Sequence, residues 1–471
     1  MTDWLHPAFT YLLTAIHTLL ALAVTFHVLL KKREVGSAIA WMGVAWLSPG
    51  LGVLLYLLFG INRVHRKAFR IRQRRQLPHT HRLPDAPARS DHLAQLELAV
   101  DRLTNRSLPT GNKVELLRDG EEAYPAMLAA IDKAAISIAL SSYIFEADAA
   151  GEPFISALIR AQARNVDIRV IVDGVGSGYI HSPVFQKLRA AGIQVGRFMH
   201  SFLPWHMAFL NMRSHKKILV VDGTIAFLGG INITAGHLPS HQPASPIRDV
   251  HFRVTGPVVT QIAEAFAADW YFVSGEELFG KKWFPPIEPA GDAEARVITS
   301  GPDRDRERLA LTFQQAIGCA RSSIKLVTPY FLPEDRLIAS LVLAAMRGVA
   351  IDIVIPAHSD NILVDWATRA HVTPLLEAGC RIWRAPKPFE HSKMFTIDGE
   401  WSLIGSPNWD VRSLRLNFEI SLEVYDDDFA ALIEQQVEKR KGRALSLKKL
   451  NRRALPVQLR DSAARLLLPY L

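Results

Sequence analysis

Two short stretches of the chain, SHKKILVVD at 214–222 and HSKMFTID at 391–398, carry the same spacing of residue types. Each contains a His, one residue, a Lys, four residues and an Asp, and the two histidines lie 176 residues apart. Six residues after each Asp comes a tetrapeptide that ends in Asn, GGIN at 229–232 and GSPN at 405–408. Two complete copies of such a frame rarely arise by coincidence, so the pattern predicts one structural unit written twice.

The sequence around the two frames is also repeated, and in the same order. SIALSSYIFEAD at 137–148 is echoed by SIKLVTPYFLPED at 323–335, and NVDIRVIVD at 165–173 by GVAIDIVIP at 348–356. In each copy a buried strand, an apolar-periodic helix and a second strand precede the His-Lys segment, which is a βαβ pattern. The sequence therefore predicts an α/β fold in which two repeated α/β/α domains form a pseudo-dimer within one chain.

Proline-rich punctuation and shifts in composition divide the chain into five predicted segments. They are a transmembrane hairpin at 1–62, a basic, Pro-rich linker at 63–107, a first half at 108–290, a second half at 291–438 and a basic tail at 439–471.

The amino-terminal segment is apolar enough to cross a bilayer. Ala8–Leu30 has 23 residues without Asp, Glu, Lys or Arg, a helix of about 34 Å against a hydrocarbon core of about 30 Å. A second uncharged run extends from Val35 to Gly60, with a kink expected at Pro49-Gly50. The length of the first run, its lack of a basic lead and the second run disfavour a cleavable signal peptide.

The distribution of charge gives the hairpin an expected orientation. Seven Lys/Arg follow the second apolar run within fifteen residues, against three between the runs. Because basic residues favour the cytoplasmic side, we expect a multi-pass protein of the inner (plasma) membrane with its large domain in the cytoplasm.

The formal net charge of +9 is concentrated in two flanks. Residues 61–82 hold eight Lys/Arg and no acid, and residues 439–460 hold nine and no acid. The rest of the chain has 38 basic and 46 acidic residues, so its body is mildly acidic. Flanks of this kind suit anionic lipid head groups, and the tail, which ends in SAARLLLPYL at 462–471, could lie in the membrane interface. A merely solvated linker and tail would read the same way.

Each frame is predicted to form a β-hairpin that presents its His and Lys together. Two apolar runs meet at Asp222-Gly223 and again at Asp398-Gly399, and Asp-Gly is typical of tight hairpin turns. Residues two apart on a strand share a face, so His and Lys can act together. Each Asp has the opposite parity and is expected to brace the turn.

These residue types point to chemistry on phosphate. A neutral His can attack phosphorus, a charged His can donate a proton, and Lys and Asn supply donors for phosphate oxygens. Two such sets that face each other need neither a metal nor another cofactor. The candidate catalytic residues are the motif members His215, Lys217, Asp222, His391, Lys393 and Asp398. The candidate phosphate-binding residues are Lys217, Asn232, Lys393, Ser406 and Asn408.

A nucleophilic His needs a carboxylate on its other ring nitrogen. Asp249 and Glu419 lie 27 and 21 residues beyond the motif aspartates, on strand-like runs, and they are the predicted orienting residues. Histidines near loops, His237 and His371 among them, are expected to have surface or structural roles.

The paired frames resemble those of the phospholipase D superfamily, and the surrounding sequence is similar to that of bacterial cardiolipin synthases. Similar segments include AIAWMGVAWLSPGLGVLLYLLFGIN at 38–62, VDGVGS at 172–177 and GSPNWDVRSLRLNFE at 405–419. The chain departs from the family at Gly230, where the second motif has Ser, and at His237, where a Tyr is common.

The resemblance implies a reaction as well as a fold. In that family one His, here His215, takes a phosphatidyl group from phosphatidylglycerol, while the other, here His391, protonates the glycerol that leaves. The hydroxyl of a second phosphatidylglycerol then attacks, and cardiolipin forms. The implied partners are phosphatidylglycerol, other anionic phospholipids and the bilayer, with no indication of an oligomeric state.

Other functions use the same residues. Water as the acceptor would give a membrane phospholipase D, and another head group could replace one phosphatidylglycerol. A nuclease is disfavoured by the mildly acidic body and the membrane spans, so no nucleic acid is expected. A lipid-binding scaffold without activity would have no use for either His.

Overall fold

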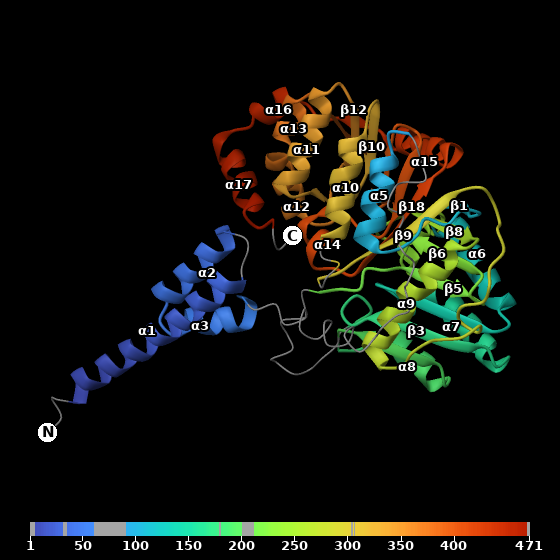
Figure 1. Ribbon diagram of the computed structural model, residues 1–471, viewed down its shortest axis with the longest axis horizontal. Helices are drawn as coiled ribbons and strands as arrows, with labels where there is room; N and C mark the ends of the chain where they lie inside the picture. The colour runs from blue at the N-terminus through green and yellow to red at the C-terminus, as the bar shows by residue number, and fades with distance from the viewer. Residues whose placement is uncertain are drawn as a thin grey trace. The chain divides into compact units, whose positions relative to one another are not determined.

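The computed structural model describes residues 5–31, 35–60, 91–178, 180–199, 212–302, 305 and 307–468. They belong to two compact units, a small one that contains the amino-terminal helices and a large one that contains both repeats (Figure 1). The Arg-rich run at 61–82 and the Pro-rich break at 78–90 lie outside the described residues.

The small unit is a pair of apolar helical segments that pack on each other. Its elements are α1 (Leu5–Lys31), α2 (Val35–Leu47), α3 (Leu51–Leu55) and the π-helical turn η1 (Tyr56–Gly60). The helix breaks at Pro49-Gly50, as predicted. Among the described helices, one segment, Phe9–Lys31, is long and apolar enough to span a membrane, by length and composition alone. The second predicted span is divided into shorter helices.

The first half of the large unit is a seven-stranded mixed sheet in the order β1-β8-β6-β5-β2-β3-β4. Its strands are β1 (Lys113–Arg118), β2 (Ser137–Ser142), β3 (Asp167–Asp173), β4 (Gln194–Phe198), β5 (Ile218–Val221), β6 (Ile225–Gly229) and β8 (Val250–Thr255). Its helices are α6 (Asp119–Lys133), α7 (Gly151–Ala163), α8 (Pro183–Ala190) and α9 (Val258–Ser274). Strands β2, β3 and β4 are parallel, which agrees with the predicted βαβ pattern.

The second half repeats this topology strand for strand and adds one edge strand. Its order is β19-β13-β12-β10-β15-β16-β18-β9. The strands are β9 (Glu294–Ser300), β10 (Ser323–Val327), β12 (Ala350–Pro356), β13 (Arg381–Ala385), β15 (Met394–Ile397), β16 (Trp401–Gly405), β18 (Glu419–Tyr425) and β19 (Arg443–Ala444). The helices are α10 (Arg308–Cys319), α11 (Asp335–Met346), α12 (Ile362–His371), α13 (Thr373–Glu377), α14 (Val411–Arg415) and α15 (Asp427–Arg440). The predicted pseudo-dimer is confirmed.

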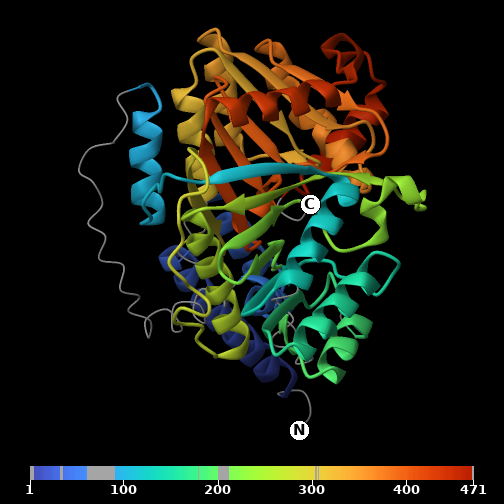
Figure 2. The same ribbon diagram turned by 90° about the vertical axis from the view of Figure 1, so that its right-hand side faces the viewer.

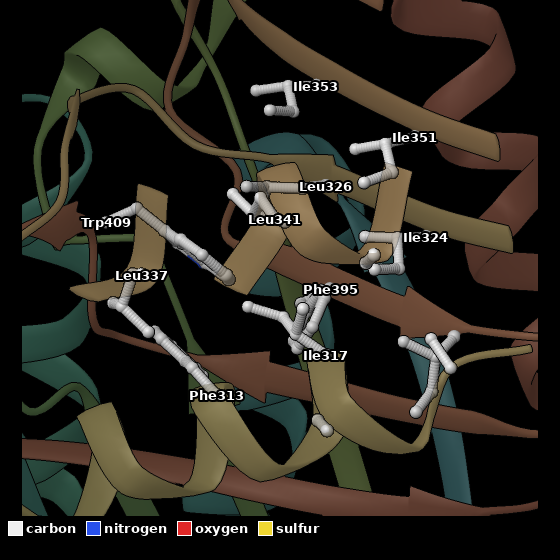
Figure 3. Close-up of a cluster of buried hydrophobic side chains, with 14 of the residues drawn as sticks. Phe313, Ile317, Ile324, Leu326, Leu337, Leu341, Ile351, Ile353, Phe395 and Trp409 are labelled. Carbon is white, nitrogen blue, oxygen red and sulfur yellow. The ribbon is translucent and has the colours of Figure 1, made fainter. Parts of the chain in front are cut away.

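A hydrophobic core fills the space between each sheet and its helices. In the second half, Phe313 and Ile317 of α10 and Leu337 of α11 face Ile324 and Phe395 of the sheet (Figure 3). All five side chains are almost completely buried. Alternating apolar residues on the strands and a 3.6-residue apolar period on the helices produce this layer.

The linker and the tail are more ordered than the sequence analysis expected. Residues 94–104 of the predicted linker form helix α5 (Ala94–Thr104), which lies along the second half (Figure 2). Leu93, Leu96 and Val100 belong to the core of that half, because they recur on one face of the helix. The predicted tail likewise contributes β19, α16 (Leu447–Asn451) and α17 (Leu455–Arg465), so the second half extends beyond residue 438.

Candidate active site

The two motif hairpins have the predicted turns. Strands β5 and β6 pair antiparallel, as do β15 and β16, and Asp222, Gly223, Asp398 and Gly399 all have positive φ, as type I′ turns require. The Asp222 carboxylate accepts hydrogen bonds from the backbone N–H groups of residues 135–137. Asp398 does the same for residues 321–323. These two candidates therefore hold the hairpin to the start of β2 or β10, at the strand end opposite His and Lys.

Each motif His enters the site from a segment that pairs with the other half. Short strand β14 (Phe389–Glu390), just before His391, runs parallel to β7 (Ile247–Arg248), just before Asp249. The mirror contact is a parallel bridge between Ser214 and Phe418, which precede His215 and Glu419. The backbone N–H of His391 donates to Arg248 O, and that of His215 donates to Phe418 O.

The orienting carboxylates are consequently crossed between the halves. His215 Nδ1 lies 3.1 Å from Glu419 Oε2 and 3.0 Å from Ser406 O. Both partners are acceptors, so Nδ1 carries the hydrogen and Nε2 keeps its lone pair. His391 Nδ1 lies 2.6 Å from Asp249 Oδ2. The acid that follows each motif thus serves the His of the other motif.

Burial favours the neutral form of both imidazoles. Burial lowers the pKa of His215 below its usual value, against the opposing charge of Glu419. Burial and the charges of Lys393 and Lys217 hold the pKa of His391 well below its usual value. Burial also opposes ionisation of Glu419, yet His215 and Lys217 bring the pKa of that carboxyl below its usual value.

The two motif lysines are buried cations beside the histidines. Lys217 Nζ donates to His215 O at 2.9 Å and lies 5.2 Å from the ring centre of Tyr143. Lys393 Nζ donates to His391 O and lies 2.8 Å from His391 Nδ1. Burial and the charge of Lys393 lower the pKa of Lys217 to about 7, and burial lowers that of Lys393 to about 8. An anion between them would favour both charged forms.

A cavity of about 910 Å³ opens over these groups. His215, His391, Asn232 and Asn408 line it together, although they come from both halves. Asn408 Oδ1 is buried and has no hydrogen-bond partner among the described residues. Asn232 Oδ1 accepts from Ile144 N–H at 3.3 Å. The cavity is large enough for a small polar group and part of a lipid.

Ser406 does not present its hydroxyl to this cavity, which differs from the expectation. Its Oγ donates to Glu419 Oε2 at 2.5 Å and is completely buried. The corresponding position in the first half is Gly230, where a Cβ would lie within 2.5 Å of both Asp249 carboxylate oxygens. The shorter Asp249 thus occupies the space that a serine would need. The glycine at position 230 therefore goes together with an Asp, rather than a Glu, at position 249.

His237 is a site residue that the sequence analysis missed. It is completely buried and lines the cavity, with its ring centre 6.0 Å from that of His391. Its Nε2 accepts from Asn232 N–H at 3.3 Å, and burial lowers its pKa to about 3. The ligand atoms of His237, Asp249 and His391 lie within 4.8 Å of one another, but Lys393 beside them opposes a metal cation. The departure from Tyr at this position was the signal available in the sequence.

Two histidines from duplicated hairpins that line one cavity, each with its motif lysine beside it, define a phospholipase D-like enzyme. A family profile described as the phospholipase D-like domain of cardiolipin synthase matches residues 127–270 and 313–441. A second profile, described as a phospholipase D-nuclease amino-terminal region, matches residues 19–60. The chain belongs to the cardiolipin synthase family, an enzyme family of the phospholipase D type.

Relatives agree with this assignment, and one solved structure shares the fold. A cardiolipin synthase of Geobacillus thermodenitrificans is 31% identical, with 95% of this chain and 91% of that protein covered. Cardiolipin synthase A of Pseudomonas putida is 33% identical, with 91% of each covered, and the major cardiolipin synthase ClsA of Bacillus subtilis is 30% identical, with 97% of each covered. The phosphatidylserine synthase structure from Haemophilus influenzae shares the fold, with a TM-score of 0.61, 15% identity, and 80% of this chain and 100% of that one covered.

Proposed function

We propose that this protein is a membrane phosphatidyltransferase that makes cardiolipin and glycerol from two phosphatidylglycerols through a phosphohistidine on His215. The observation that carries the proposal is that His215 and His391 line one cavity and each has Nδ1 on a buried carboxylate. The names of the relatives support cardiolipin as the product.

In the first step His215 is the nucleophile. Glu419 holds its Nδ1–H, so the Nε2 lone pair can attack the phosphorus of phosphatidylglycerol. The bond between phosphorus and the head-group glycerol oxygen breaks, and His391 gives that oxygen a proton. The negative charge of the bound phosphodiester raises the proton affinity of His391, which burial and the neighbouring lysines lower.

In the second step the roles reverse. His391, now neutral, accepts the proton of the terminal hydroxyl of a second phosphatidylglycerol, and that oxygen attacks phosphorus. The bond between phosphorus and Nε2 breaks, which releases cardiolipin and restores His215. Atoms and protons balance without a cofactor. Lys217 and Lys393 stabilise the charge on the phosphate oxygens, with Asn232 and Asn408 as amide donors.

The apolar amino-terminal helices support membrane association. We propose that they form a two-span hairpin in the plasma membrane, with the catalytic unit on the cytoplasmic side. The seven Lys/Arg that follow the second apolar run support this orientation.

The dependence of activity on pH should be bell-shaped and narrow. The acid limb of kcat/KM should lie below pH 6.5, because His215 must be neutral and its pKa is lowered from that value. The alkaline limb should lie near pH 7 to 8, because Lys217 and Lys393 lose their protons there and phosphate is then bound by fewer cations. In Lys217→Arg, the alkaline limb should move upward, since Arg stays charged. A profile flat from about pH 5 to 9 would contradict the assignment of the alkaline limb to Lys217 and Lys393.

The direct test is product analysis of the full-length protein in phosphatidylglycerol vesicles, with a chelator and without added metal. Cardiolipin and free glycerol should appear in equal amounts, and His215→Ala should give neither. Phosphatidic acid in place of cardiolipin would identify hydrolysis as the reaction. A requirement for a second head-group lipid would overturn phosphatidylglycerol as the sole substrate.

A further inference from the structure

Helix α17 exposes a row of leucines on its outer face. Leu455, Leu459 and Leu466 are 67%, 62% and 76% exposed. They are spaced four and seven residues apart, and Leu466 keeps helical backbone angles at the C-cap, so the three share one face. An apolar stripe of this spacing on a surface helix normally faces a protein core.

The opposite face of α17 is firmly attached to the second half. Ala464 packs with Val364 and Ala367 of α12, and Figure 1 shows the two helices side by side. Asp461 is completely buried and accepts hydrogen bonds from Arg453 and Arg460. Because these contacts fix the helix about its axis, the leucines are held away from the protein rather than exposed by fraying.

Exposed cations precede α17 in the sequence and end it. Lys448, Lys449, Arg452 and Arg465 are exposed, and residues 439–460 contain no acid. The acid of α17 itself, Asp461, is buried and already paired. A helix with an apolar stripe between basic residues has the composition of one that lies in the interface of an anionic membrane.

The buried face of α17 packs on residues that line the candidate active site. Leu332 and Val364 line the cavity and at the same time pack in the cluster that supports α17. Ile362, at the start of α12, is 59% exposed and follows Asn361, another lining residue. The cluster that supports α17 therefore also forms part of the cavity wall, and Ile362 adds an exposed apolar side chain next to a lining residue.

We infer that α17 docks the catalytic unit on an anionic bilayer, with Leu455, Leu459 and Leu466 inserted among the lipids beside the entrance of the cavity. The inference rests on the proposed function, which requires a lipid to reach the cavity. Basic residues around an apolar row match anionic head groups above acyl chains. A second copy of this chain would have to bring an acidic surface to the same place.

The test separates membrane docking from catalysis by the physical form of the substrate. The variant Leu455→Gln, Leu459→Gln, Leu466→Gln is compared with a control, Ile159→Gln, Leu343→Gln, Phe279→Gln, whose side chains are 40%, 58% and 76% exposed on other elements of the large unit. Both full-length proteins act on phosphatidylglycerol vesicles and on short-chain phosphatidylglycerol dispersed as monomers. The ratio of vesicle to monomer activity should fall by about 10- to 100-fold in the α17 variant, the scale expected from loss of several partly inserted apolar side chains, and stay unchanged in the control.

The outcomes distinguish the inference from the proposed function. Equal loss on both substrate forms, or no loss, would overturn membrane docking, whereas no product from either form in the wild-type protein would overturn the proposed function. A photoreactive amino acid at position 459 identifies what covers the helix. Adducts with phospholipid support the inference, and adducts with a second copy or with another protein overturn it.

Discussion

Glu419→Gln should disable His215, and Asp249→Asn should disable His391, so each substitution acts on the motif of the other half. Each should lower kcat/KM on the order of 10³- to 10⁴-fold, the scale seen when the orienting carboxylate of a Ser-His-Asp triad is replaced by an amide. The physical reason is that an amide can present its NH₂ to Nδ1, which favours the tautomer with the hydrogen on Nε2. Nε2 then has no lone pair for attack or for proton abstraction.

A substrate with a good leaving group distinguishes the loss of the nucleophile, His215, from the loss of the acid and base, His391. Phosphatidyl-p-nitrophenol releases an anion that needs no proton, so the first step no longer requires His391. Asp249→Asn and His391→Ala should therefore release about one p-nitrophenol per active site and then stop, because the acceptor hydroxyl has no base. Glu419→Gln and His215→Ala should release almost none.

The grouping of the variants is the decisive observation. If Glu419→Gln behaves like His391→Ala, the crossed contacts do not orient the histidines. A burst in the His215→Ala variant and none in His391→Ala would exchange the two histidine roles. Glu115→Gln, which changes a half-buried carboxylate on β1 that pairs with Lys113 and Arg253, serves as the control and should match the wild-type protein.

Gly230→Ser should reduce activity by at least about 100-fold, the scale of a 1 Å misplacement of a catalytic group. The new Cβ would lie within 2.5 Å of both Asp249 oxygens, so the carboxylate must move away from His391. Because this step concerns His391, the p-nitrophenol burst should survive in Gly230→Ser. The measurement is kcat with phosphatidylglycerol, together with the thermal unfolding midpoint to confirm the fold.

The second half suggests a second substitution that should restore activity to Gly230→Ser. There a serine at the equivalent place, Ser406, donates to a glutamate, Glu419, and the two halves have matching sheet register at these strands. Gly230→Ser combined with Asp249→Glu should therefore recover part of the activity that each single change removes. Ser406→Gly, which removes one hydrogen bond without a clash, should cost less than Gly230→Ser. A folded double variant no better than either single variant would contradict the steric explanation.

Much of the fold could be predicted because the relevant interactions are local. Asp222-Gly223 and Asp398-Gly399 specify tight turns through the backbone conformations that they tolerate, and the apolar runs beside them specify the paired strands. The duplicated order of segments predicts the pseudo-dimer, because two segments with the same order of strands and helices fold into the same sheet topology. The same reasoning placed His and Lys on one face and both aspartates at the turns.

The folded linker and tail show where that reasoning fell short. Helix α5 and helix α17 lie in segments whose Pro and Arg content is typical of linkers and solvated tails. Their apolar residues, such as Leu96 and Ala464, are buried against the second half, and this burial is what stabilises the two helices. Composition averages over a segment and misses a single buried face.

The sequence by itself determined the duplicated halves, the two His-Lys sets and the acids Asp249 and Glu419, because spacing and periodicity record contacts within a strand or hairpin. Only the tertiary structure decided which acid serves which histidine. The pairs are separated by 204 and 142 residues, and they meet because short segments of the two halves pair, β14 with β7 and Ser214 with Phe418. The burial of Ser406 and His237 at the site also depends on this packing of the two halves. Contacts between the halves produce no periodic pattern of residues in the sequence of either half.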